Sequence, residues 1–375
     1  MSDGPSILLT GGGVVSNSEV DKILREAVVI DGLGPIFWYQ EDKEAYLKTV
    51  HRSGLTAFSH TMILPYDFMP DGFLEFVEAA EEWHRMSEND PDILTLAHSA
   101  SEILQAKRDG RVAVIFSLQN PFPIGAHVEY LAALYRLGLR ICQLTYQRRS
   151  LLADGCGEPG NAGLSSLGKS AVAEMNRVHI VIDLSHCGER SSLEAIEISK
   201  DPVIVSHAGV RELTDTTRNI SNEQIDAVVN RDGVIGVMAE KEFIRREGRS
   251  YVDAYVDHIE FLLDRAGDDD HVGMGLDLAE GFPESRLRLF QRMLPETGMK
   301  EVDYAVPELN SPTKLPNLIE RLISRRHTSQ TIRKILGLNF LRVFEQVWDG
   351  RSSGSSSDPS VVRRTGVETW PPARG

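Results

Sequence analysis

Cysteine is scarce in this sequence of 375 residues, which contains only Cys142, Cys156 and Cys187. Their odd number and wide spacing form neither a C-x-x-C motif nor a disulfide framework, so we expect a reducing, cytoplasmic environment. No run of about 20 apolar residues is present, and we therefore expect no membrane-spanning helix. The first residues also lack an apolar segment followed by a small-residue cleavage site, so they predict no secretory signal.

Positive charge is also in deficit. The sequence has 40 Lys and Arg against 55 Asp and Glu, a formal net charge of −15. Such a charge repels nucleic-acid phosphates and anionic lipids, so we expect neither a nucleic-acid nor a membrane partner. Hydrophobic residues make up 41% and charged residues 25%, as in globular proteins. Only residues 351–375, which are rich in Ser, Gly and Pro, predict a disordered tail.

Eight short apolar runs, each ending in a polar residue, alternate with segments of helical periodicity. This alternation predicts βαβ units with a parallel sheet, and strands that are apolar on both faces favour an (α/β)₈ TIM-type barrel. A doubly wound open sheet is the alternative. We predict an N-terminal extension over residues 1–25, the barrel with C-terminal helices over 26–350, and the tail over 351–375. The runs are Ala27–Asp31, Leu55–His60, Val112–Gln119, Leu139–Tyr146, His179–His186, Pro202–His207, Gly233–Met238 and His271–Asp277.

Polar side chains stand where these runs end, at the face that carries the chemistry in such barrels. His186 and His207 end consecutive strands and Asp277 ends the last one, a set able to hold Zn²⁺ and to accept a proton from metal-bound water. Either histidine alone would suit an ordinary buried hydrogen-bonding role, but the three together favour function. His60 ends the second strand and could reach the same site. Asp183 is expected to be a supporting or packing carboxylate.

Several ordered segments resemble the membrane (renal) dipeptidase family, peptidase family M19 of the amidohydrolase-like barrels. The resemblance extends over about residues 26–348. It implies two zinc ions, of which His186 and His207 hold one. Asp277 would lie at the other zinc and serve in proton transfer, and Arg218 would bind the free carboxylate of a dipeptide. The segments are Glu174–His186, Pro202–His207, Arg218-Asn219, Val272–Asp277 and Ile335–Phe344.

The sequence departs from the family pattern at several ligand and pocket positions. Leu33 and Pro35 replace the H-x-D ligands of the first strand, and Gln119 replaces the bridging glutamate. Tyr146 stands where the family has a histidine that polarises the scissile carbonyl. Met238-Ala239-Glu240 replaces an asparagine and aromatic residues in the substrate pocket. The resemblance therefore implies a divergent member with one zinc rather than two, or with none.

Three functional hypotheses follow. The first is a dipeptidase-like, mononuclear metallohydrolase that cleaves an amide bond in a small carboxylate-bearing substrate. The second is a repurposed barrel enzyme, such as a metal-free isomerase, lyase or biosynthetic tailoring enzyme. The third, ranked last, is a non-catalytic small-acid binding protein. Family members often dimerise, which leaves a homodimer open.

The first hypothesis assigns a role to each candidate residue. The phenol of Tyr146 would donate to the oxyanion, and the carboxylate of Asp277 would accept the proton. Glu240 would either favour an amino group of the substrate or face solvent. The assignments are Asp277 and Tyr146 for catalysis, Arg218, Glu240 and His60 for substrate binding, and His186, His207 and Gln119 for the metal.

Overall fold

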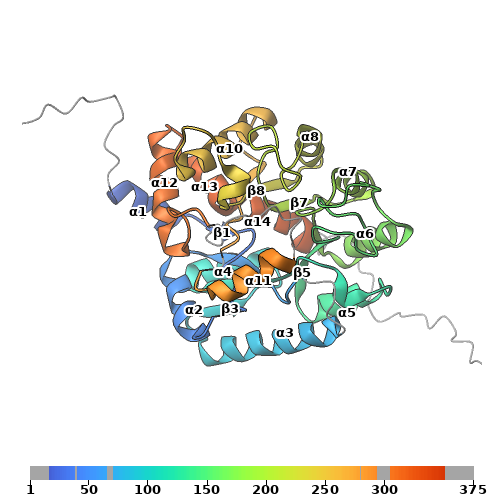
Figure 1. Ribbon diagram of the computed structural model, residues 1–375. Helices are drawn as coiled ribbons and strands as arrows, with labels where there is room; N and C mark the ends of the chain where they lie inside the picture. Colours follow the sequence, from blue (N-terminus) through green and yellow to red (C-terminus); the bar gives the residue numbers. More distant parts are fainter. Residues whose placement is uncertain (1–16, 39, 66–70, 279, 294–304, 351–375) are drawn as a thin grey trace, which may run out of the picture.

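The computed structural model describes residues 17–38, 40–65, 71–278, 280–293 and 305–350; the predicted tail lies outside these residues. Within them every strand pair is parallel, and the strand order is β1-β2-β4-β5-β6-β7-β8-β9. Each predicted run overlaps one of these strands, β2 and β7 extending one residue beyond their runs, and helices fill the connections (Figure 1). The strands are β1 (Ile30–Asp31), β2 (Ala57–Thr61), β4 (Val112–Leu118), β5 (Leu139–Gln143), β6 (Val181–Asp183), β7 (Ile204–Ala208), β8 (Val234–Val237) and β9 (Val272–Met274).

The last strand returns to the first. The amide of Gly32 donates to the carbonyl of Met274, and the amide of Asp277 donates to the carbonyl of Leu33, each at 2.9 Å. The side chain of Asp31 adds a third link, because its Oδ1 accepts from the amide of Leu276 at 2.8 Å. These bonds close the eight strands into the predicted (α/β)₈ barrel, and the doubly wound alternative is wrong.

A ninth strand, β3 (Leu94–Leu96), lies outside the predicted set, since we expected only helix between the second and third runs. It pairs with the first half of β4, from Val112 to Val114, whereas β5 pairs with β4 only from Phe116 onward. The short strand therefore covers the part of the β4 edge that β5 leaves free. Three residues are too few for an alternating pattern to be read in the sequence.

The helices surround the barrel, and several begin at side-chain caps that are visible in the sequence. Ser99 with Glu102, and Ser221 with Gln224, form capping boxes at two of these starts. The helices are α1 (Asn17–Glu26), α2 (Lys43–Arg52), α3 (Gly72–Asn89), α4 (Ala100–Asp109), α5 (Tyr130–Arg136), α6 (Ser166–Val178), α7 (Glu189–Ile198), α8 (Asn222–Asn230), α9 (Lys241–Ile244), α10 (Tyr251–Ala266), α11 (Glu284–Met293), α12 (Leu315–Ser324), α13 (Ser329–Arg333) and α14 (Asn339–Phe344), with short 3₁₀ or π turns at Phe122–Ile124, Pro312–Lys314, Lys334–Leu338 and Glu345–Asp349.

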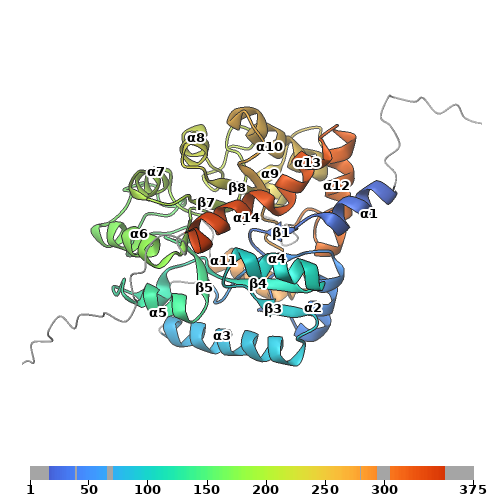
Figure 2. The same cartoon turned by 180° about the vertical axis from the view of Figure 1, so that it is seen from behind.

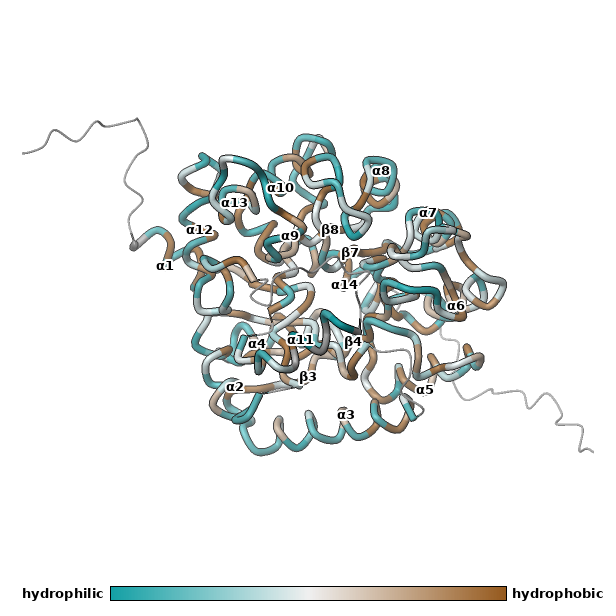
Figure 3. Tube along the Cα trace, viewed as in Figure 1, coloured by the Kyte–Doolittle hydropathy of each residue, from teal (hydrophilic) through white to brown (hydrophobic). Residues whose placement is uncertain are grey.

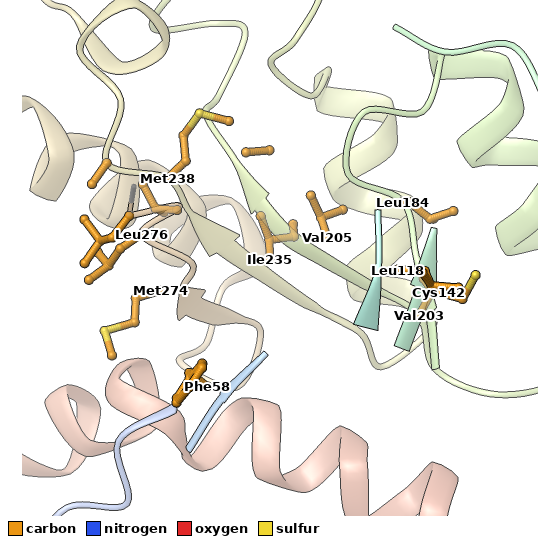
Figure 4. Packing of buried hydrophobic residues seen from close by; sticks show 14 of the residues in the cluster. Phe58, Leu118, Cys142, Leu184, Val203, Val205, Ile235, Met238, Met274 and Leu276 are labelled. Atoms are coloured by element: carbon orange, nitrogen blue, oxygen red, sulfur yellow. The ribbon is translucent and has the colours of Figure 1, made fainter. Parts of the chain in front are cut away.

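Side chains alternate along each strand between two apolar layers. The outer layer faces the helices and includes Leu118, Cys142 and Leu184 (Figure 4). The inner layer contains alternate strand residues such as Ile115 and joins Phe340 of α14. Helix α11 lies in front of the barrel in Figure 1, and helix α14 lies in front of it in the opposite view of Figure 2. The C-terminal helices thus close one end of the barrel, and the strand ends that carry the polar residues form the mouth at the other.

Three further features bear on the predicted organisation. Helix α1 buries Val20 and Ile23 and contacts α12, so the boundary expected after residue 25 falls at the end of a packed helix. The hydropathy colouring shows largely hydrophilic outer helices, such as α3 and α8 (Figure 3). No helix among the described residues combines the length and the apolar character needed to cross a membrane.

Candidate active site

Three side chains from the ends of β4, β6 and β7 meet at the mouth of the barrel. The Nε2 atoms of His186, which follows β6, and His207, in β7, lie 2.8 Å apart. Gln119, which follows β4, places its Nε2 3.5 Å from Nε2 of His186 and 3.3 Å from Nε2 of His207. All three side chains are buried. The structure therefore gathers the three residues that the sequence nominated as metal ligands.

The backbone at two strand ends is unusual. His186 and Asp277 have φ values of 64° and 54°, in the left-handed region that residues other than glycine rarely adopt. Such conformations cost about 1–3 kcal/mol and are concentrated at functional sites. The loop after β5 stabilises the first of them, because the amide of Cys156 donates to the carbonyl of His186 at 2.8 Å. These turns direct the two side chains at the mouth.

Both imidazoles of the pair are neutral at neutral pH. Burial is the main reason that the pKa of His186 lies well below its ordinary value, and the positive charge of Arg218 lowers it further. The pKa of His207 is lowered well below its ordinary value by the same two causes. Neutral imidazoles keep a lone pair that can bind a metal ion or accept a proton.

Arg218 reaches the pair from the loop between β7 and α8. Its Nη2 donates to the carbonyl of His207 at 2.8 Å and lies 3.3 Å from Nε2 of His186. Its Nη1 is buried and has no hydrogen-bond partner among the described residues. Asn219 holds the loop, because its side chain accepts from the amide of Gly209 and donates to the carbonyl of Phe243. The Arg-Asn pair thus combines an anchor with a guanidinium that is free to bind an anion.

Glu240 and Asp277 form a carboxyl pair on the β8–β9 side of the mouth, where a side-chain hydrogen bond joins them. Glu240 is buried, and Asp277 is partly exposed. Loss of surrounding water is the main cause that raises the pKa of both groups, well above the ordinary value for Glu240. The negative charge of Asp277 raises the pKa of Glu240 further, while the hydrogen bond from Glu240 and the charge of Arg218 oppose the rise at Asp277. Glu240 therefore faces the mouth rather than solvent, as a neutral acid that donates to Asp277.

Tyr146 lies against the histidine pair. Its ring centroid is 4.1 Å from that of His186, with an angle of 35° between the ring planes. The side chain is buried, and Tyr146 lies three residues after the end of β5. The structure thus places Tyr146 beside the groups that it was predicted to assist.

His60 is not part of this cluster, contrary to the expectation that it reaches the site. Its ring packs against Phe37, Trp83 and Phe58, with centroids 5.8, 5.0 and 6.4 Å away, and its Nδ1 lies 3.3 Å from the carbonyl of Pro35. Burial lowers the pKa of His60 to about 3. Phe58 belongs to the outer apolar layer, and His60, two residues later, shares its face of the strand. A side chain on that face packs under the helices instead of lining the mouth.

The donors at the mouth do not fit two metal ions. Leu33 and Pro35 are buried and offer no ligating atom in their side chains. Among the described residues, no group of three or more His, Cys, Asp or Glu side chains is arranged to hold a metal. The two converging Nε2 atoms and the amide of Gln119 fit a single ion at most.

One predicted carboxylate and two serines that were not predicted support the histidines. Asp183, predicted to be a supporting carboxylate, accepts hydrogen bonds from Ser185, Ser206 and Gln143. The two serines were missed, although each stands directly before a candidate histidine, in the repeated pair Ser-His that ends the fifth and sixth predicted runs. That repetition is the signal that could have found them.

Comparison with known proteins identifies the family of this chain. The model of the family described as membrane dipeptidase (peptidase family M19) matches residues 19–303 and 298–357. The chain belongs to the M19 family. It is 29% identical to dipeptidase verJ of Clonostachys rogersoniana over 310 residues, which cover 81% of this chain and 74% of that protein. Dipeptidase tcpJ of Claviceps purpurea is 27% identical over 272 residues, 72% of this chain and 59% of that protein.

Solved structures extend the comparison to three dimensions. The crystal structure of an amidohydrolase from Pseudomonas aeruginosa matches with a TM-score of 0.78 and 28% identity, covering 88% of this chain and 99% of that one. The M19 family is metal-dependent, and membership makes this chain an enzyme of the hydrolase type. The resemblance read from the strand-end motifs is confirmed.

Proposed function

We propose that this M19 protein hydrolyses an amide bond in a small substrate that carries a free carboxylate, at a site that holds at most one metal ion. The observation that supports this most directly is the convergence of His186, His207 and Gln119 at the mouth, with Arg218 beside them. A single Zn²⁺ held by the two histidines, with the amide of Gln119, would supply water activation. The relatives named as dipeptidases support a reaction of the same class.

Each remaining residue has a role that follows from its position. The unpartnered Nη1 of Arg218 presents a charged donor that can bind the substrate carboxylate. Asp277, held by a hydrogen bond from Glu240, accepts the proton of the attacking water. Tyr146, whose ring lies against that of His186, donates to the oxyanion that develops on the substrate carbonyl.

A second candidate is a metal-free acid–base enzyme on the same barrel, such as an isomerase or lyase. It is favoured by the absence of ligating side chains at Leu33 and Pro35 and by the hydrogen-bonded pair Glu240 and Asp277 beside Arg218. A neutral acid next to a carboxylate can give and take a proton without a metal. Elemental analysis of protein purified without added metal separates the two: one zinc per chain favours hydrolysis, and none favours the second candidate.

The main test is a panel of dipeptides and other amides with free or methyl-esterified C-termini. We expect the free acids to be hydrolysed and the esters to react poorly. Arg218→Met should lower kcat/KM for the free acids by about 10–100-fold, as expected when a charged hydrogen bond is lost, and should leave the ester rates little changed. Arg265→Met, on the outer helix α10, is the matched control and should behave as wild type. No turnover of any amide, or equal turnover of acid and ester, would contradict the proposal.

A further inference from the structure

Five hydrogen bonds converge on the carboxylate of Asp183, which is buried inside the barrel next to His207. Oδ1 accepts from the amide and the hydroxyl of Ser185, at 3.0 and 2.9 Å, and from the amide of Ser206 at 2.9 Å. Oδ2 accepts from the hydroxyl of Ser206 at 2.6 Å and from Nε2 of Gln143 at 2.9 Å. Both oxygens thus act as acceptors, and the hydroxyl protons of both serines are directed at them.

This arrangement determines which ring nitrogen of His207 carries its proton. The Oγ of Ser206 also lies 2.7 Å from Nδ1 of His207. A serine hydroxyl has a single proton, and here that proton is donated to Asp183. Ser206 can therefore only accept from the ring, which requires a proton on Nδ1 of His207 and leaves a lone pair on its Nε2.

The reverse arrangement is less favourable. If Ser206 donated to Nδ1 of His207, the short bond to the carboxylate of Asp183 would be lost, and hydrogen bonds to carboxylates are the stronger kind. The position of Ser206 is also tightly defined, because a Cβ added at Gly236 or Gly275 would lie 2.1 or 1.9 Å from its carbonyl oxygen. These close approaches hold the backbone of Ser206 in place, and the hydrogen bond to Asp183 orients its hydroxyl.

His186 differs from His207 in this respect. Its Nδ1 is buried and has no hydrogen-bond partner among the described residues. The neighbours of its Nε2 act in opposite directions: the lone pair on Nε2 of His207, 2.8 Å away, favours a proton there, whereas Nη2 of Arg218, 3.3 Å away, can only donate and favours a lone pair. His186 can thus carry a proton on Nε2 and donate it to His207, or carry it on Nδ1 and turn a second lone pair toward a cation.

We propose that Asp183 and Ser206 are positioning residues that hold His207 in the Nδ1–H tautomer, whereas no such hydrogen bond holds Nδ1 of His186. The Nε2 lone pair of His207 then faces the mouth whether or not a metal is bound. Support of a ligand's second nitrogen by hydrogen-bonded groups is a general feature of histidine ligands. The consequence for turnover rests on the proposed function, but the tautomer itself does not.

The test uses the full-length protein labelled with ¹⁵N-histidine and treated with a chelator. Long-range ¹H–¹⁵N spectra distinguish protonated from unprotonated ring nitrogens, and the spectrum of His207→Gln assigns the signals of that residue. We expect the wild type to show a protonated Nδ1 and an unprotonated Nε2. Ser206→Ala should convert most of the signal to the Nε2–H form, and Ser206→Thr, which keeps the hydroxyl, should retain the Nδ1–H form.

Ser117→Ala is the matched control, because its hydroxyl is also buried and has no partner among the described residues. It should leave the tautomer of His207 unchanged. With an amide substrate, Ser206→Ala should lower kcat/KM by about 10–100-fold and Ser206→Thr should restore most of it. A wild-type His207 protonated on Nε2, or an unchanged tautomer in Ser206→Ala, would overturn the proposal. Absence of amide hydrolysis in the wild type would instead count against the proposed function, since the spectra need no turnover.

Discussion

The two sides of the barrel mouth are built differently. At the ends of β6 and β7, His186 and His207 are directed toward each other, and one of them is held by buried hydrogen bonds. At the end of β1, Leu33 and Pro35 are buried and apolar, although the family resemblance places two metal ligands there. The two histidines can bind a cation, whereas the side chains of Leu33 and Pro35 cannot.

The difference shows that the groups that close the barrel at the end of β1 are distinct from the side chains that would bind a metal there. Asp31 and the backbone of Gly32 and Leu33 still link β1 to β9. These links do not depend on the side chains at positions 33 and 35. The fold can therefore tolerate loss of the metal donors on this side, whereas the β6–β7 side cannot lose Ser206 or Asp183 without leaving buried groups unpaired.

The largest effect on the polar side should come from Asp277→Asn. Amide for carboxylate removes the proton acceptor with little change in shape, so kcat should fall by about 10²–10⁴-fold. Circular dichroism should show an unchanged fold. Asp264→Asn, an exposed change on α10, should keep wild-type activity. If Asp277→Asn retains activity within a few-fold of wild type, Asp277 has no part in the mechanism.

Introducing the missing ligands at the end of β1 should increase the number of metal ions that the protein binds. Wild-type protein should contain at most one transition-metal ion per chain by elemental analysis, because Leu33 and Pro35 have no ligating side chain. The triple variant Leu33→His, Pro35→Asp and Gln119→Glu should raise the number toward two, since it restores the donor types that bind and bridge such ions. Two metals in the wild type, 3.5–4 Å apart by anomalous scattering, would contradict the one-metal interpretation.

Glu240→Gln should change how stability depends on pH. The pKa of Glu240 is raised in the folded protein, so above the unfolded-state value, near 4.3, folding requires uptake of a proton. Wild-type stability contributed by this group is therefore present at low pH and lost as pH rises toward the folded-state pKa. Glutamine carries no such requirement, and the melting temperature of the variant relative to wild type should increase from pH 5 to pH 8.

An increase of about 2–4 °C would correspond to roughly 1 kcal/mol. The matched control is Glu320→Gln, an exposed change on α12, which should give a difference that does not depend on pH. A constant difference for Glu240→Gln as well would show that the Glu240 and Asp277 pair does not share a proton as described.

The sequence was sufficient for the barrel and for most of the mouth. Parallel strands end at one face, so the position of a polar residue after an apolar run places it there regardless of finer detail. The sequence was insufficient for the face of the strand on which a side chain lies, because Gln119 and His60 both end predicted strands but lie on opposite faces. The alternation of Phe58 with Ser59 carried that information. The repeated Ser-His pair could have pointed to Ser185 and Ser206, but their hydrogen bonds to Asp183 could not be predicted because they depend on contacts between strands.

The smallest effect should come from His60→Phe, which tests the face on which this residue lies. The ring packs among aromatic side chains of the outer layer, so kcat/KM should stay within about threefold of wild type, while loss of the hydrogen bond to Pro35 should cost about 1 kcal/mol at neutral pH. The pKa of His60 is lowered to about 3 in the folded protein, whereas in the unfolded chain it is near 6.5. As pH falls below 6.5, His60 becomes protonated in the unfolded chain but stays neutral in the folded protein, so the free energy of unfolding of the wild type declines. The melting temperatures of variant and wild type should therefore approach each other from pH 7 to pH 5, and a tenfold or greater loss of kcat/KM would place His60 in the site after all.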